Sequence, residues 1–239
     1  MKLKTIINTA LLVGMVGCAD LDLNPLSEGS SEAWYSNATE VEMSVNDLFR
    51  SVFWQGYEDS WTDDFTNREA LTPITNATIN GEWGTLNTLW ANTYKVIARS
   101  NTLLLNMDKI QGTVPQATID TYTGNAHFVR AAKYGELVFL FGDVIHSTTI
   151  LSLEEAFTMG RTDKNTVKEA VYEDFDIAAS LLPESYGSSE NKLATKGAAY
   201  AMKARFALQM GDFAIARDAA KACMDLGVHE LYPDYGELF

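Results

Sequence analysis

The chain has 239 residues, of which 46% are hydrophobic and 21% charged, and its formal net charge is −14. This composition is typical of a globular protein with one large domain or two small ones. An acidic surface repels phosphate backbones, so we expect no nucleic-acid partner. Cys18 and Cys223 are the only cysteines, and they lie far apart, with three scattered histidines. The sequence therefore predicts neither a metal site nor a cofactor.

The N-terminus has the pattern of a secretory leader. Two lysines precede an apolar run, Ile6–Val16, that is too short to span a bilayer as a stable helix. The run ends in Gly17-Cys18, and a small residue before a cysteine resembles a bacterial lipobox. We predict a signal peptide over residues 1–17, acylation of Cys18 and a lipidated tether over residues 18–38. The alternative is a plain secretory leader with an incidental cysteine.

The remaining residues, 39–239, have helical periodicity and no competing β-alternation, which predicts an all-α domain. Thr39-x-x-Glu42 and Thr166-x-x-Glu169 have the pattern of capping boxes and predict two helix starts. Between them, the apolar spacing over Leu86–Met107 predicts a further helix.

A long loop, Gly56–Trp83, follows the first predicted helix, and loops of this length inside a helical body are often functional. Its aromatic rings could stack on sugar rings, and its carboxylates and amides could pair with hydroxyl groups. The alternative is that Trp83 packs on the next helix and that the acidic pair is merely solvated. The candidate ligand-binding residues are Trp61, Asp63, Asp64, Asn67, Arg68, Asn76, Asn80 and Trp83.

The segment Gly124–Val144 is apolar on nearly every side, which predicts a buried helix that ends at Gly142. A buried Arg130 needs partners, so we expect it to tie loops to the core rather than to contact a ligand. One stripe of this helix consists of Phe128, Ala131, Ala132, Gly135 and Phe139.

Residues 195–226 have the pattern of a tetratricopeptide repeat. Thr195 caps one helix, Gly211-Asp212 turns the chain, and alanine-rich stripes face each other across the pair. Cys223 lies on the inner stripe, which indicates a small buried hydrophobe rather than a nucleophile.

Several of these segments resemble the SusD/RagB family of Bacteroidetes outer-membrane nutrient-binding lipoproteins. The resemblance covers Cys18–Phe239, about the N-terminal half of a family member, and Ile145 stands where the family has proline. It implies a tetratricopeptide-like fold with long irregular loops, and a glycan site built partly from loops in the region of residues 56–83. The matching residues include Trp90, Tyr94, Ile97, Asn101, Ala126, Phe128, Arg130, Ala131, Tyr134, Leu137, Phe141, Gly142, Asp143 and Val144.

The resemblance implies a lipoprotein on the surface of the outer membrane that captures oligosaccharides and delivers them to a SusC-like TonB-dependent transporter. A glycoside hydrolase would need two carboxylates roughly 5–10 Å apart on a rigid frame. Asp63 and Asp64 are adjacent on a predicted loop, and no hydrolase motif is present, so we expect no enzyme. The other alternative is a tetratricopeptide interaction scaffold in the cell envelope without its own glycan site.

Overall fold

The computed structural model describes residues 34–54, 61–62, 73–187 and 193–237. Within these ranges the chain is helical, apart from one isolated antiparallel bridge between Val144 and Thr162. This confirms the all-α prediction. None of the described helices is long and apolar enough to cross a membrane.

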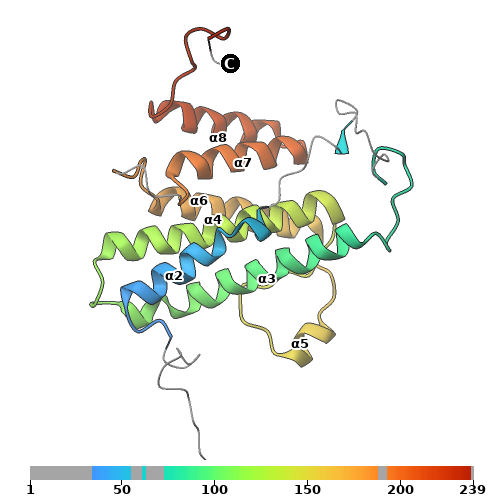
Figure 1. The fold of residues 1–239 in the computed structure, drawn as a ribbon, viewed down its shortest axis with the longest axis horizontal. Coiled ribbons are helices and arrows are strands. Elements are labelled where there is room, and N and C mark those ends of the chain that lie inside the picture. Colours follow the sequence, from blue (N-terminus) through green and yellow to red (C-terminus); the bar gives the residue numbers. More distant parts are fainter. Residues whose placement is uncertain (1–33, 55–60, 63–72, 188–192, 238–239) are drawn as a thin grey trace, which may run out of the picture. The chain divides into compact units, whose positions relative to one another are not determined.

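Apart from α5, the helices form a layered array in which each helix packs on the next one along the chain. α3 packs on α4, α4 on α6, α6 on α7 and α7 on α8, while α2 lies across α3 and α4 (Figure 1). The bounds are α2 Ala38–Leu48, η1 Ser51–Phe53, α3 Gly84–Asn106, η3 Met107–Ile110, α4 Gln116–Phe141, α5 Leu153–Thr158, α6 Lys164–Leu181, α7 Lys196–Met210 and α8 Phe213–Asp225.

The start of α2 differs from the sequence prediction. The Asn37 side chain accepts a hydrogen bond from the backbone of Glu40, and the Glu40 carboxylate accepts one from the backbone of Ser36. The predicted box at Thr39 and Glu42 is therefore wrong. Asn37 and Glu40, which lie earlier in the chain, pair with N–H groups at the start of the helix that have no partner within it. The helix therefore begins after Asn37.

The start of α6 is also earlier than predicted, because Asp163 rather than Thr166 is the N-cap. Its carboxylate accepts hydrogen bonds from the backbone of Asn165 and Thr166. The bridge at Thr162 fixes the backbone just before this position, and Asp143 accepts from the backbone N–H of Lys164. These contacts from a distant segment select the cap.

The α7–α8 hairpin agrees with the predicted repeat. Thr195 caps α7 by accepting from the backbone of Ala198, and Gly211 ends it in the left-handed conformation, with φ of 81°. Cys223 is half-buried rather than fully buried, and its Sγ donates to the carbonyl of Gly197 at 3.4 Å.

The buried helix is α4, as predicted, and Gly142 ends it with φ of 70°. Most of its apolar side chains lie in the core with Val96, Val171 and Phe175 from α3 and α6. Phe139 is the one large apolar side chain of α4 that is exposed. It is 47% exposed, because no described segment covers the last turn of that stripe.

Candidate functional site

Two of the predicted binding residues, Trp61 and Trp83, lie next to each other. Their ring centroids are 5.9 Å apart and their planes are tilted by 55°. Both side chains are half-buried, and Trp83 directly precedes α3, which holds it at the helix start. Adjacent aromatic faces of this kind suit the stacking of a ring-shaped ligand.

Asn76 and Asn80 lie exposed on the turn between these tryptophans. The Asn76 Oδ1 accepts from the backbone N–H of Thr78 at 3.1 Å and from its hydroxyl at 2.6 Å. The Asn80 Oδ1 accepts from the backbone of Glu82 at 2.9 Å. Both amide oxygens therefore shape the turn, and ligand contact by these residues stays a prediction.

The other predicted residues lie outside the described ranges. These are Asp63, Asp64, Asn67 and Arg68 in the loop, and Cys18 at the predicted lipidation site. Their roles in binding and anchoring stay predictions.

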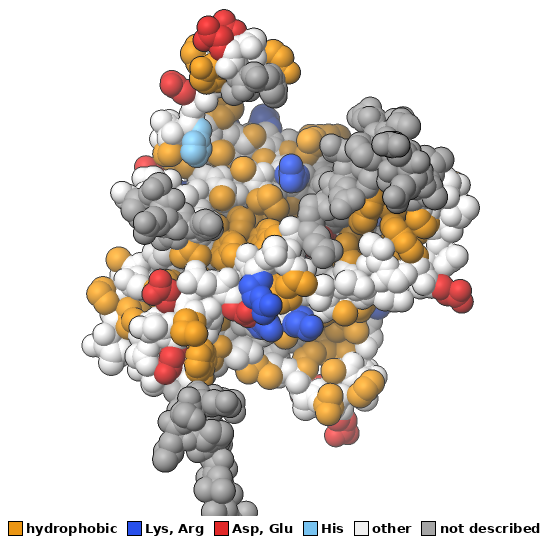
Figure 2. All heavy atoms as spheres, in the orientation of Figure 1, with side chains coloured by type: hydrophobic (Ala, Val, Ile, Leu, Met, Phe, Trp, Pro, Cys, Tyr) orange, Lys and Arg blue, Asp and Glu red, His pale blue; other side chains and the backbone are white. Residues whose placement is uncertain are grey.

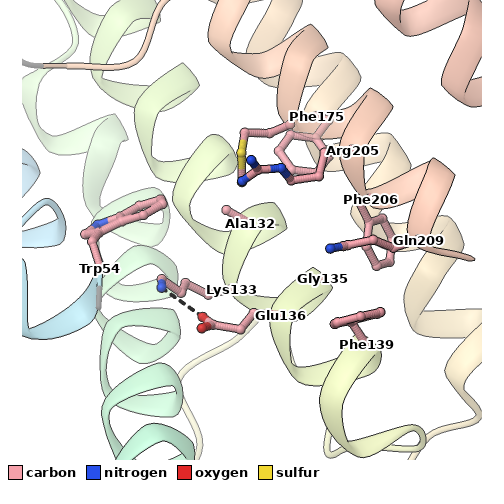
Figure 3. Close-up of a pocket in the computed structure, with 11 residues that line it drawn as sticks. Trp54, Ala132, Lys133, Gly135, Glu136, Phe139, Phe175, Arg205, Phe206 and Gln209 are labelled. Atoms are coloured by element: carbon pink, nitrogen blue, oxygen red, sulfur yellow. Dashed lines mark hydrogen bonds and ion pairs between the residues drawn. The ribbon is translucent and has the colours of Figure 1, made fainter. Parts of the chain in front are cut away.

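A groove that the sequence did not indicate runs between α4, α6, α7 and the residue after η1. Its volume is about 540 Å³. Trp54 forms one side, while Phe139 and Phe206 form the other (Figure 3). The sequence signal was weak, because the walls come from segments that only the fold brings together. The lining is completed by Ala132, Lys133, Gly135, Glu136, Phe175, Met202, Arg205 and Gln209.

The floor of the groove carries a buried ion pair. Lys133 Nζ lies 2.8 Å from a Glu136 carboxylate oxygen, and the two side chains are 5% and 12% exposed. The same ammonium lies 4.5 Å from the centroid of the Trp54 ring, whose Nε1 donates to the carbonyl of Leu48. The pair is thus neutral overall and firmly positioned.

A second cavity, of about 360 Å³, lies between α3 and the segment 145–151. Tyr134 holds that segment, because its hydroxyl donates to the carbonyl of Ser147 at 2.9 Å and accepts from its backbone N–H at 2.8 Å. Burial raises the pKa of Tyr134 to about 12, which keeps the hydroxyl protonated. The Trp90 ring lines the cavity and packs edge-on against Phe141.

Arg130 is buried and paired, as predicted, but it bonds helix residues directly and reaches a loop only through Asn101. It makes two 2.7 Å hydrogen bonds to Asp174 on α6 and one of 3.0 Å to Asn101 on α3. The Asn101 amide in turn donates to the carbonyls of Ser147 and Thr149. We call Arg130, Asp174, His127 and Asn101 the Arg130 network.

The charge on Asp174 is stabilised within this network. Burial alone would raise its pKa, but hydrogen bonds from Arg130 and His127 outweigh burial and lower the pKa below its ordinary value. The carboxylate is therefore ionised and fully engaged, and it is not available as a general acid. Across the described ranges, no three His, Cys, Asp or Glu side chains gather to hold a metal ion.

All comparisons with known proteins point to the same family. The SusD-like_3 family model, described as starch-binding and associating with the outer membrane, matches residues 15–208. Two curated proteins of Formosa agariphila, SusD-like protein P2 and SusD-like protein P25, are 27% and 25% identical over the whole chain. The chain spans 50% and 49% of their lengths, about half of each.

Solved structures with the same fold are also SusD-like. A SusD-like protein from Bacteroides fragilis is 26% identical with a TM-score of 0.69, and the match covers 84% of this chain and 40% of that one. A laminarin-binding SusD-like protein is 20% identical with a TM-score of 0.68, and the match covers 85% and 48%. On the strength of the family match over most of its length, the chain belongs to the SusD-like family of starch-binding, outer-membrane-associated proteins.

Proposed function

We propose that the protein is a surface lipoprotein that binds oligosaccharides without cleaving them and delivers them to a SusC-like TonB-dependent transporter. Anchoring would use acyl chains on Cys18. Family membership and the description of that family as starch-binding and outer-membrane-associated support this proposal.

The single observation that carries the placement of the binding site is the pairing of Trp61 with Trp83. The two rings are distant in sequence and adjacent in space. Trp83 directly precedes α3, and the side chains of Asn76 and Asn80 fix the backbone that leads to it. A preformed aromatic platform reduces the entropy lost on binding.

A non-catalytic role fits the chemistry of the buried carboxylates. Asp174 is committed to Arg130, and Glu136 is committed to Lys133. Neither carboxylate is part of a pair poised around an open site, which glycoside hydrolysis requires.

The test is affinity electrophoresis of the native protein through gels that contain starch or laminarin, with analysis of the polysaccharide for cleavage products. The proposal expects retardation by at least one neutral glucan and no products. Free mobility in both gels, or release of sugars by the pure protein, would contradict it.

Anchoring and delivery are tested separately in cells. We expect labelled palmitate to be incorporated into the wild-type protein and not into Cys18→Ala. We also expect a large outer-membrane barrel to co-purify with the wild-type protein. Co-purification of a soluble partner alone would favour the interaction-scaffold alternative.

A further inference from the structure

α5 lies outside the layered array of helices. None of its residues is buried, and it stands away from the array at the end opposite α8 (Figure 1). Ser152 and Glu155 form a capping box at its start, so the helix is stabilised by its own side chains rather than by packing on a neighbour. We call residues 150–160 the α5 finger.

The base of the α5 finger is firmly attached to the protein. Val144 and Thr162 exchange two backbone hydrogen bonds of 3.3 and 2.8 Å. The Arg161 guanidinium donates to the carbonyl of Asp143 at 2.8 Å. These bonds hold the finger at a fixed point of the surface, which reduces the entropy that it would lose on contact with a partner.

The α5 finger presents large apolar side chains to solvent. Ile150, Leu153 and Phe157 are 58%, 80% and 87% exposed. Leu153 and Phe157 are four residues apart in the helix and therefore lie on the same face. Figure 2 shows hydrophobic side chains next to an acidic one on this projection, at the lower right of the view. Apolar side chains gathered on a projection indicate a contact with another protein.

The cavity of about 360 Å³ beside α3 lies at the inner side of the α5 finger. Ala156 of α5 faces it, while Phe157 points away into solvent. The finger thus offers a side chain that can enter a partner, and the cavity offers a hollow for an apolar side chain of that partner. Other residues that line the cavity include Trp90, Ile97, Ile150 and Leu151.

The charge of the α5 finger restricts the choice of partner. Glu154 is exposed and takes part in none of the ion pairs within the described ranges. Glu155 is also exposed, although its carboxylate accepts hydrogen bonds from Ser152. A second copy of this chain fits badly, because each copy carries a net charge of −14. An anionic membrane surface would repel the same two carboxylates.

The proposed function names an oligosaccharide, the outer membrane and a transporter as partners. An oligosaccharide matches the tip badly, because Ile150 and Leu153 offer no hydrogen bonds to its hydroxyl groups. We infer that the α5 finger and the cavity beside it contact the transporter, and that the transporter presents an apolar socket bordered by lysine or arginine. This inference rests on the proposed function and adds to it the contact surface and its chemistry.

Site-specific photocrosslinking in the bacterium that carries the gene tests this inference on the native protein. The variants are Leu153→p-benzoylphenylalanine and Phe157→p-benzoylphenylalanine, and both side chains are exposed, so the core stays intact. The matched control is Met224→p-benzoylphenylalanine on α8, because Met224 is also apolar and 78% exposed. We expect crosslinks from both finger positions to a large outer-membrane barrel, and none from Met224 to that barrel.

Other crosslinking results would overturn the inference. Crosslinks from the finger to lipid, to a second copy of the chain or to another part of the same polypeptide would do so. So would the absence of crosslinks from variants that accumulate to the wild-type level, or equal crosslinking to the barrel from Met224.

Co-purification separates this inference from the proposed function. Phe157→Ala should lower the amount of barrel recovered about tenfold, as loss of a central apolar contact does. Glu154→Lys should lower it too, while Met224→Ala should recover as much as wild type, and all three should keep the wild-type melting temperature. If wild type and both finger variants recover equal amounts of barrel, the inference is wrong and delivery to a transporter still stands. If wild type recovers no barrel, delivery itself is wrong, and the inference falls with it.

Discussion

Around Arg130, side chains from three helices are buried and bonded to one another across the core. Around Trp61 and Trp83, in contrast, the polar side chains of Asn76 and Asn80 are exposed and bond to backbone two residues away. The first arrangement fixes how α3, α4 and α6 pack, and the second fixes only the course of a turn. A loop shaped in this way can change its side chains without disturbing the core.

The largest expected effect comes from removing the centre of the Arg130 network. Arg130→Ala leaves the ionised Asp174 buried without its guanidinium partner, so the free energy of unfolding should fall by about 3–5 kcal/mol. Urea denaturation measures this change.

A surface pair provides the control for that substitution. Arg99 bonds Asp47, but their side chains are 37% and 33% exposed, so Arg99→Ala should cost at most about 1 kcal/mol. Similar losses in the two variants would contradict the contrast drawn between buried and exposed polar groups.

Lowering the pH should reveal the contribution of the Arg130 network to the stability of the wild-type protein. The pKa of Asp174 is lowered in the folded state, so the unfolded chain takes up the proton first as the pH falls. The ionised Asp174 carboxylate contributes to the free energy of unfolding at any pH above its pKa in the unfolded chain, about 3.9. This contribution is lost as the pH falls through the lower pKa of Asp174 in the folded protein. Asp174→Asn should therefore flatten the acid limb of a plot of unfolding free energy against pH. An unchanged acid limb would count against the network.

Close packing of the same helices predicts a further loss of stability. A Cβ at Gly124 on α4 would lie 2.9 Å from Leu182 Cγ and 3.1 Å from Leu181 Cβ, so Gly124→Ala should cost about 1–3 kcal/mol. The control is Gly84→Ala at the start of α3, where a Cβ meets nothing within 4 Å. Thermal unfolding should separate the two variants, and equal melting temperatures would argue against tight packing at Gly124.

The smallest expected effect concerns the start of α6. Asp163→Ala removes the N-cap and should cost about 1 kcal/mol, while Thr166→Ala should cost less, because its side chain does not cap the helix. Chemical denaturation of the pair decides between the two positions. A larger loss of stability for Thr166→Ala than for Asp163→Ala would indicate that Thr166 caps α6, as the sequence predicted.

The core could be predicted from sequence because its signals are local and periodic. The apolar run of α4 correctly predicted a buried helix. Thr195 and Gly211 mark the start and the end of α7, as their residue types predict. The starts of α2 and α6 were misplaced because several polar residues could cap each helix. At α6, contacts made by Asp143 and Thr162 decide among them, and these lie outside any local pattern.

The candidate site was only partly predictable. The aromatic residues of the loop indicated ligand contact, but nothing in the spacing of Trp61 and Trp83 indicated that their rings meet. The groove was missed because Trp54, Phe139 and Arg205 come from three distant segments. Phe139 was expected in the core because its stripe is apolar, and sequence alone cannot tell where the covering helices end.

The most direct test of the account is a calorimetric titration of the native protein with oligosaccharides of starch and of laminarin. Wild type is compared with Trp61→Ala, Trp83→Ala and the loop control Ile79→Ala, whose side chain is 46% exposed. We predict that either tryptophan variant binds at least about tenfold more weakly, a loss of about 1.4 kcal/mol, while Ile79→Ala binds like wild type and all three keep the wild-type melting temperature. Unchanged affinity in both tryptophan variants would contradict the account, because the ligand would then bind elsewhere on the protein.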